Sequence, residues 1–125
     1  MKYRGIIISG ACIKNCQEIA KRLENAQLYK IIRVVSSDIE KKYWDYINYK
    51  KLSKIDESKF LIKKEGHNNI VAIFLQEFNE IIEKNMVPII VTGKESVNTM
   101  IEEFGKLGLY FMSFYINDVN ENVVD

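Results

Sequence analysis

Residues 4–23 constrain the fold more than any other stretch of the chain. Within them, residues 5–9 (GIIIS) form the continuous apolar run that a two-sided parallel sheet requires, so they predict a buried strand. Gly10 predicts a turn, and Asn15 with Glu18 three positions later predicts a helix N-cap. One face of this helix is apolar and carries Cys16, Ile19, Ala20 and Leu23. The chain therefore opens with a strand, a glycine turn and an amphipathic helix.

The same frame opens phosphate-binding loops, whose pattern is G-x-x-x-x-G-K-[ST]. Their glycines let backbone N–H groups close around phosphates, the lysine meets the outer phosphates, and the hydroxyl holds a magnesium ion. Counted from Gly10, Asn15 takes the place of the second glycine. Cys16 takes that of the lysine and Gln17 that of the hydroxyl. We therefore interpret this stretch as a degenerate P-loop.

Strands and helices are predicted to alternate along the rest of the chain, which favours an α/β fold with a parallel sheet and right-handed crossovers. Further strands are predicted at residues 31–36, 87–91 and 109–116. Further helices are predicted at residues 70–85 and from 93 to about 105. Thr92 and Glu95 form a second capping-box pattern, which predicts the start of the latter helix.

Residues 37–69 differ in character and predict an irregular insert with short elements. Between Lys41 and Lys64 there are eight lysines against three acidic residues, a local charge of +5. Aromatic residues lie among them, including Tyr43, Trp44, Tyr46 and Tyr49. Such a cluster can stack bases or attract an acidic or phosphorylated peptide. It can equally be a solvated surface whose lysine stems cover apolar side chains.

Length and composition narrow the function classes. The 125 residues predict a single domain over 1–125, with an acidic tail at residues 117–125. A net charge of +1 argues against attraction of the whole surface to nucleic acid or anionic membrane. The apolar runs are far shorter than the roughly 20 residues that span a bilayer. We therefore predict a cytoplasmic protein that binds no membrane.

The cysteines and the histidine carry no recognisable chemistry. Cys12 and Cys16 are too few for a disulfide framework, and a zinc site normally needs four ligands. The only histidine, His67, has no nucleophile motif near it, so we interpret it as a loop residue. Residues 92–94 (TGK) have Pro88 where a P-loop has its first glycine, and they predict only a helix start. We expect no metal and no cofactor.

The order of these elements resembles that of the guanylate kinase family. The first strand and the Gly10 turn match its P-loop frame. Residues 48–60 (NYKKLSKIDESKF) resemble the D-Y-x-F-V-S-x-x-x-F segment of its nucleotide-monophosphate-binding insert. Residues 65–69 (EGHNN) stand where that family has an H-G-N-Y-Y-G-like stretch. The resemblance implies a three-layer, P-loop-NTPase-like parallel sheet with helices on both faces and a short insert, without the lid and closing helices that follow in the family.

The departures from the family pattern concern the groups that stabilise a moving phosphoryl charge. The chain has three arginines, Arg4, Arg22 and Arg33. The family's two phosphate-clamping arginines have no counterpart in residues 36–40 (SSDIE). The acidic residue that the family places at the end of the strand at 87–91 is Thr92 or Gly93 here. We therefore expect a pseudoenzyme without kinase activity.

The resemblance implies a non-catalytic protein that binds an acidic or phosphorylated partner protein on its former nucleotide surface. That surface is expected to include Tyr46, Tyr49, Lys50, Lys51 and Ser53. The alternative is a guanine-nucleotide sensor in which Ser53 or Glu65 reads the base. A weak single-strand nucleic-acid binder is a third interpretation, which the near-neutral charge disfavours. An uncovered last strand would favour a homodimer, through side chains among Phe111, Phe114 and Tyr115.

Overall fold

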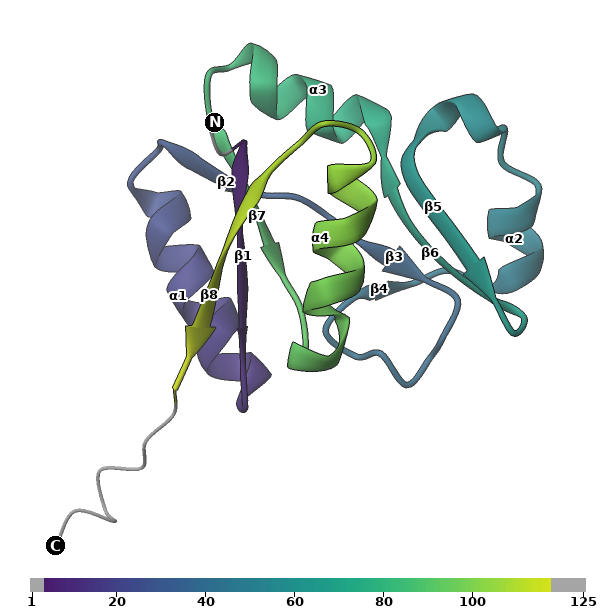
Figure 1. Ribbon diagram of the computed structural model, residues 1–125, viewed down its shortest axis with the longest axis horizontal. Helices are drawn as coiled ribbons and strands as arrows, with labels where there is room; N and C mark the ends of the chain where they lie inside the picture. The colour runs from purple at the N-terminus through teal and green to yellow at the C-terminus, as the bar shows by residue number, and fades with distance from the viewer. Residues whose placement is uncertain (1–3, 118–125) are drawn as a thin grey trace, which may run out of the picture.

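The computed structural model describes residues 4–117, so most of the predicted acidic tail at 117–125 lies outside the described part. Four parallel strands form one sheet in the order β2-β7-β1-β8 (Figure 1). They are β1 (Gly5–Gly10), β2 (Tyr29–Ile31), β7 (Val87–Val91) and β8 (Phe111–Ile116). The predicted α/β class and parallel sheet are confirmed, and no helix between residues 4 and 117 is long and apolar enough to cross a membrane.

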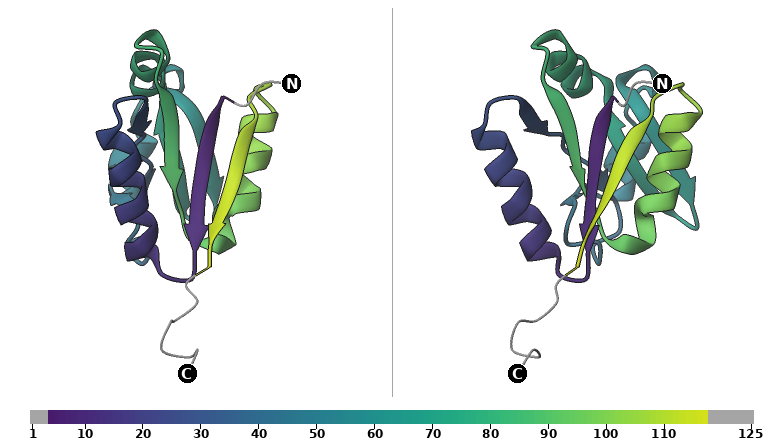
Figure 2. Two further views of the ribbon diagram at one scale, coloured as in Figure 1. Left: turned by 90° about the vertical axis from the view of Figure 1, so that its left-hand side faces the viewer. Right: turned by 60° about the vertical axis from the view of Figure 1, so that its left-hand side comes forward.

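Helices cover both faces of this sheet (Figure 2). Adjacent residues of a strand point to opposite faces, so β1 contributes side chains to both layers. On one side, Ile8 packs with Cys16 and Ala20 of α1 (Ile13–Asn25). On the other side, Ile7 belongs to a larger cluster with residues of α3 (Leu75–Glu83) and α4 (Val97–Gly105). Burial on both faces explains why β1 is a continuous apolar run.

A second, mixed sheet has the strand order β4-β3-β6-β5. Its strands are β3 (Val35–Ser36), β4 (Asp45–Tyr46), β5 (Phe60–Gly66) and β6 (Asn69–Phe74). One face packs on Leu52 of α2 (Tyr49–Ser53), and the other joins the main core through Ile62 and Ile73. Two short 3-10 helices complete the fold, η1 (Glu57–Lys59) and η2 (Lys94–Ser96). Residues 37–69 therefore do carry short elements outside the parallel sheet, as predicted, but their strands join β3 and β6 in a second sheet that the sequence did not predict.

The single strand predicted at 31–36 is wrong. β2 ends at Ile31 and β3 begins at Val35, and the two belong to different sheets. The Ile32 N–H still donates to the carbonyl of Ile89, whereas the carbonyl of Val34 accepts from the N–H of Asp45 in the second sheet. An uninterrupted apolar run cannot reveal this change of partner, because both environments bury β-branched residues equally well.

The helix predicted at 70–85 is also wrong in its first part. Residues 69–74 form β6, and the helix α3 begins only at Leu75. Ile70 and Ala72 pack against α2 while Ile73 packs into the main core. A strand buried on both faces does not alternate apolar and polar residues. Its apolar residues can therefore fall at the spacing expected of a helix, which explains the wrong prediction.

Both predicted capping boxes are wrong, although their helices exist. The N-cap of α1 is Cys12, and Asn15 lies inside the helix. α4 begins at Val97 after η2, and the Glu95 side chain accepts a hydrogen bond from the Tyr43 hydroxyl. Local spacing cannot show that Glu95 has a distant partner.

Candidate functional site

The topology places a crevice at the carboxyl ends of the parallel strands. The crossover from β1 to β2 runs through α1 on one face, and the crossover from β7 to β8 runs through α4 on the other. The direction of the connections therefore reverses between β1 and β7. In open α/β sheets, ligands bind outside the carboxyl ends of the strands at such a reversal.

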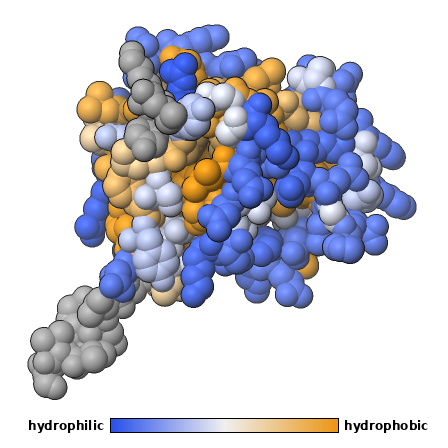
Figure 3. Space-filling view, in the orientation of Figure 1, coloured by the Kyte–Doolittle hydropathy of each residue, from blue (hydrophilic) through white to orange (hydrophobic). Residues whose placement is uncertain are grey.

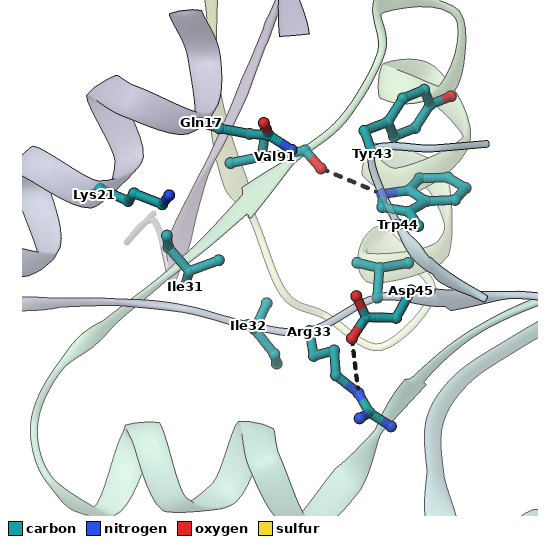
Figure 4. Close-up of a pocket in the computed structure, with 10 residues that line it drawn as sticks. Gln17, Lys21, Ile31, Ile32, Arg33, Tyr43, Trp44, Asp45 and Val91 are labelled. Carbon is teal, nitrogen blue, oxygen red and sulfur yellow. Dashed lines mark hydrogen bonds and ion pairs between the residues drawn. The ribbon is translucent and has the colours of Figure 1, made fainter. Parts of the chain in front are cut away.

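Two cavities lie at this edge. The larger, about 370 Å³, lies between α1, the segment that follows β2, and the end of β7 (Figure 4). Gln17 and Lys21 of α1 line one of its sides and Arg33 another. The smaller, about 240 Å³, lies between α4 and the second sheet, and Lys64 and Glu103 are among its lining residues.

Trp44 lines both cavities and separates them. Its side chain is only 8% exposed, and its Nε1–H donates to the carbonyl oxygen of Val91 at 3.2 Å (Figure 4). Val91 is the last residue of β7, so the indole covers the end of this strand. A buried tryptophan normally needs a partner for its N–H, and this carbonyl supplies it. The indole therefore occupies space at the edge where open α/β sheets bind ligands.

Two side chains close to Trp44 in the sequence bind to a residue that lies just before α4. The Tyr43 hydroxyl donates to the Glu95 carboxylate, and the Lys41 ammonium lies 3.4 Å from the same carboxylate. The hydrogen bond from Tyr43 lowers the pKa of Glu95, and Lys41 adds to this effect. Burial, reinforced by the Glu95 contact, raises the pKa of Tyr43, which keeps its hydroxyl protonated as a donor.

The arginine of the larger cavity already has two acidic partners. The Arg33 Nε lies 3.6 Å from the carboxylate of Asp45 and 3.8 Å from that of Glu77. Its guanidinium also lies over the ring of Phe74, 5.6 Å from the centroid. Phosphate binding by Arg33 would have to compete with two carboxylates. One of these carboxylates, that of Asp45, lines the same cavity. Lys21 is therefore the cation of this cavity that makes no ion pair with another described residue.

The four positions that we compared with a P-loop are not arranged as a loop. Only Ala11 and Cys12 connect β1 to α1, and Asn15, Cys16 and Gln17 are helical. Asn15 is exposed, Cys16 is buried, and Gln17 faces the larger cavity. A Cβ on Gly10 would lie 2.6 Å from the carbonyl oxygen of Ile116. The close approach of β8 therefore explains this glycine without a phosphate.

The residues proposed as a binding surface lie on and around α2, and we call them the α2 surface. They are Tyr46, Tyr49, Lys50, Lys51, Ser53 and Glu65. The Tyr49 hydroxyl donates to the Glu65 carboxylate at 3.0 Å, and this contact raises the pKa of Tyr49. The Ser53 hydroxyl donates to the carbonyl of Lys50 at 2.9 Å. Tyr46, on the edge strand β4, is 52% exposed.

The fold sorts the eight lysines of the insert into two groups. Three pair with carboxylates: Lys41 with Glu95, Lys63 with Glu57 and Glu65, and Lys64 with Glu103. The other five make no ion pair within residues 4–117, namely Lys42, Lys50, Lys51, Lys54 and Lys59. Two of the neutralising acids come from outside the insert, so the local charge of +5 could not show which lysines were available.

Other residues singled out in the sequence take no part in the crevice. His67 is exposed in the two-residue turn between β5 and β6, with φ of 26°. Among the described residues, no three His, Cys, Asp or Glu side chains come together as a metal ion would require. Sequence reasoning missed Lys21, Arg33 and the boundary role of Trp44. They come together only because the chain passes from the first sheet to the second between β2 and β3, and because Trp44 lies at the end of β7.

Comparison with solved structures identifies the fold. The chain matches the crystal structure of guanylate kinase from Anaplasma phagocytophilum with a TM-score of 0.54 and 14% sequence identity. The match covers 94% of this chain and 62% of that kinase. No family model and no curated protein matches the sequence. At this identity the likeness establishes a guanylate kinase-like fold and says nothing of activity.

Proposed function

We propose that this chain is a non-catalytic binding module that holds an acidic or phosphorylated segment of a partner protein on the α2 surface. The observation that carries the proposal is that Lys50 and Lys51 are both exposed and make no ion pair with another described residue. Both follow the exposed Tyr49. Unpaired ammonium groups beside aromatic rings suit recognition of carboxylates or phosphates.

The one carboxylate of the α2 surface, that of Glu65, should repel an acidic ligand only weakly, because it already has two partners. Glu65 accepts a hydrogen bond from Tyr49 and lies 3.6 Å from the Lys63 ammonium. Lys63 also contacts Glu57 at 2.7 Å, and that hydrogen bond raises the pKa of Lys63. These contacts pair the acids locally and leave Lys50 and Lys51, among the described residues, as the unpaired cations of the α2 surface.

The proposed absence of phosphoryl transfer rests on the groups around the crevice. Phosphoryl transfer needs cations and backbone N–H groups placed around the moving charge. Here Arg33 is paired with two carboxylates, and the β1–α1 connection is two residues long. A coupled assay with GMP, ATP and magnesium is expected to show no turnover. Measurable turnover that depends on the crevice residue Lys21 would contradict this part of the proposal.

The peptide proposal is tested by fluorescence anisotropy with three labelled peptides of equal length. One is rich in glutamate, one carries phosphoserines, and one carries glutamine at the same positions. The double variant Lys50→Glu/Lys51→Glu is expected to bind the charged peptides roughly tenfold more weakly, because each exposed pair contributes up to about 1 kcal/mol. Its circular dichroism and melting curve should match the wild type, because both side chains are exposed.

The matched control is Lys14→Glu/Lys84→Glu, which changes the net charge by the same amount on α1 and at the end of α3. Both lysines are exposed. This control should bind the peptides like the wild type. Equal weakening in both double variants would show nonspecific attraction, and no binding of either charged peptide would refute the proposal.

A guanine-nucleotide sensor is the second candidate, and the cavity of about 370 Å³ beside Lys21 favours it. Trp44 is the only tryptophan of the chain and lines both cavities, so its fluorescence should report a ligand in either. Titration with GMP, GDP and GTP should then change the emission and saturate. A ligand at 100 times its Kd would also stabilise the protein by about 2.7 kcal/mol. Unchanged emission and melting at millimolar nucleotide would exclude this candidate.

Single-strand nucleic-acid binding receives less support from the geometry. Of the five aromatic residues in the insert, Trp44 and Phe60 are buried and Tyr43 is half-buried against Trp44, with ring centroids 4.9 Å apart. Tyr46 and Tyr49 stay exposed, and the latter is hydrogen-bonded to Glu65. A stacking platform for successive bases needs several free rings.

A further inference from the structure

The four sheet edges of this protein are protected unequally. An unprotected edge strand exposes N–H and C=O groups that pair readily with another strand, and proteins block such edges with short strands or charges. β2 has three residues, and the Glu24 carboxylate accepts from the N–H of Ile31 there at 2.9 Å. β4 has only two residues, one of them charged. β5 carries Lys63, Lys64 and Glu65.

Among the strands within residues 4–117, the remaining edge strand, β8, has none of these protections in its own sequence. It has six residues, FMSFYI, without a charge, a proline or a glycine. Tyr115 is 53% exposed, Phe114 44% and Met112 37%. The α1 side of β8 also opens into an apolar groove of about 440 Å³, with Ile19 and Leu23 on the opposite wall. Figure 3 shows the contrast between this apolar side and the hydrophilic surface over the second sheet.

We propose that β8 pairs antiparallel with β8 of a second copy of this chain, so that two parallel sheets join into one continuous sheet across a twofold axis. A second copy is the occupant that β8 suits best, because antiparallel self-pairing brings each strand against its own sequence. A charged strand would then meet its own charges, whereas β8 has none. Closed twofold dimers are also the commonest protein assemblies.

Side-chain alternation restricts the register of this pairing. Met112 and Phe114 face α1, while Phe111 stacks on Phe104 of α4 on the other side. Directly opposed residues share a face, so the axis must pass through one residue of β8 and not between two. An axis at Ser113 sets this serine against itself and Met112 against Phe114 of the second copy. An axis at Phe114 would set Phe111 against the polar Asn117, so we assign the axis to Ser113.

The exposed area predicts a weak dimer. The three exposed side chains offer on the order of 300 Å² per copy, since a large aromatic side chain buries 150–250 Å² in full. A standard interface buries about 800 Å² per partner, and smaller ones are weak. The backbone hydrogen bonds of the new strand pair add to this area. We therefore expect a Kd between about 10 µM and about 1 mM.

Sedimentation velocity over this concentration range tests the proposal with the protein alone. The weight-average mass should rise from 14.6 kDa toward twice that value. Tyr115→Lys should keep the protein monomeric, because it places two lysines at the shared edge. Tyr46→Lys is the matched control, an equally exposed tyrosine on the edge strand β4, and should dimerise like the wild type. A monomer at every concentration, or equal loss in both variants, would overturn the proposal.

Cross-linking tests the register and does not depend on how a lysine variant folds. Ser113 is exposed, so Ser113→Cys should fold normally and, under mild oxidation, give a covalent dimer. Directly opposed residues bring their Cβ atoms to about 4.5–5.5 Å, close to disulfide range. Ser58→Cys, an exposed serine in η1, measures cross-linking by random collision, and the wild type controls for Cys12 and Cys16. The assigned register would be refuted if the Ser113→Cys variant gave no more covalent dimer than the two controls.

Discussion

Trp44 joins the two sheets through a single polar atom. Its Nε1–H reaches the carbonyl of Val91 from 47 positions away in the sequence, and its ring contacts Tyr43 edge-on. The rest of the indole is packed in the main core. This residue therefore helps to position the second sheet relative to the end of β7, and it lies at the boundary between the two cavities.

Replacing Trp44 by phenylalanine should destabilise the protein by about 1–3 kcal/mol, because the carbonyl of Val91 loses its buried donor and a small void remains. Urea unfolding followed by circular dichroism measures the change. Tyr43→Phe removes a more exposed hydroxyl and serves as the control, with an expected loss of about 1 kcal/mol or less. Unchanged stability of the Trp44 variant would show that the indole N–H contributes nothing net.

Glu95 should make part of the stability depend on pH. The Tyr43 hydrogen bond and Lys41 lower the pKa of Glu95 from 4.5, so the ionised form stabilises the folded state. A depressed folded pKa gives stability that is present above the unfolded value and is lost as the pH falls through the folded value. Glu95→Gln should therefore lower the free energy of unfolding at neutral pH, and its difference from the wild type should shrink below about pH 4.5.

The control for Glu95 is Glu102→Gln, on the exposed side of α4, whose carboxylate makes no ion pair with another described residue. Its difference from the wild type should be small at every pH. Free energies of unfolding measured at several pH values separate the two variants. A Glu95 difference that persists undiminished in acid would contradict the proposed ionic contribution.

The junction of β1, α1 and β8 depends on one small residue. A Cβ at Gly10 would lie 2.6 Å from the carbonyl oxygen of Ile116 and 3.0 Å from the Sγ of Cys16. The backbone carbonyl cannot move aside without disturbing the pairing between Gly10 and Ile116. This element boundary is therefore fixed by packing against both the neighbouring strand and the helix.

Gly10→Ala should destabilise the protein by about 1–3 kcal/mol, the usual cost of overpacking a tight site. Gly105→Ala, at the end of α4, is the matched control, because nothing lies within 4 Å of its added Cβ. That control should be neutral or stabilising by up to about 1 kcal/mol, since alanine favours a helix. Thermal and urea unfolding of both variants give the comparison, and equal effects would contradict the close-contact explanation.

On the scale of the whole molecule, the two sheets share one core. Ile7 and Ile90 of the parallel sheet belong to the same buried cluster as Ile62 and Ile73 of the second sheet. Side-chain contacts across the boundary add to this, including the 3.4 Å pair between Lys64 and Glu103. We therefore expect the described part of the chain to unfold as one cooperative unit.

Ile73→Ala tests this expectation. The residue is fully buried, so its truncation should cost about 2–5 kcal/mol. Trp44 fluorescence reports the boundary between the sheets, and far-UV circular dichroism reports both sheets together. The two unfolding curves should coincide in the wild type and move together in the variant. Ile39→Ala, at a residue 67% exposed, is the control and should shift neither curve. Separated transitions would contradict a shared core.

Local sequence was sufficient for three of the four strands of the parallel sheet, and only the edge strand β2 was misplaced. β1 and β7 lie where residues 5–9 and 87–91 predicted them, and β8 is two residues shorter at its start than predicted. The apolar face of α1 is also as predicted, with Cys16 and Ala20 buried. These elements are central or covered on one clear face, so their composition follows directly from their burial. Phe114 and Tyr115 are exposed, as an uncovered last strand would require, whereas Phe111 is buried against α4.

The sequence by itself determined the parallel α/β frame, the amphipathic helices and the residue types available for binding. Only the tertiary structure decided that residues 31–36 divide between two sheets and that residues 69–74 are a strand. It also decided that Trp44 covers the end of β7, and which lysines are neutralised, by Glu95 and Glu103 among others. The physical reason is that periodicity records whether a residue is buried, whereas its partner depends on chain segments 39 to 54 positions away.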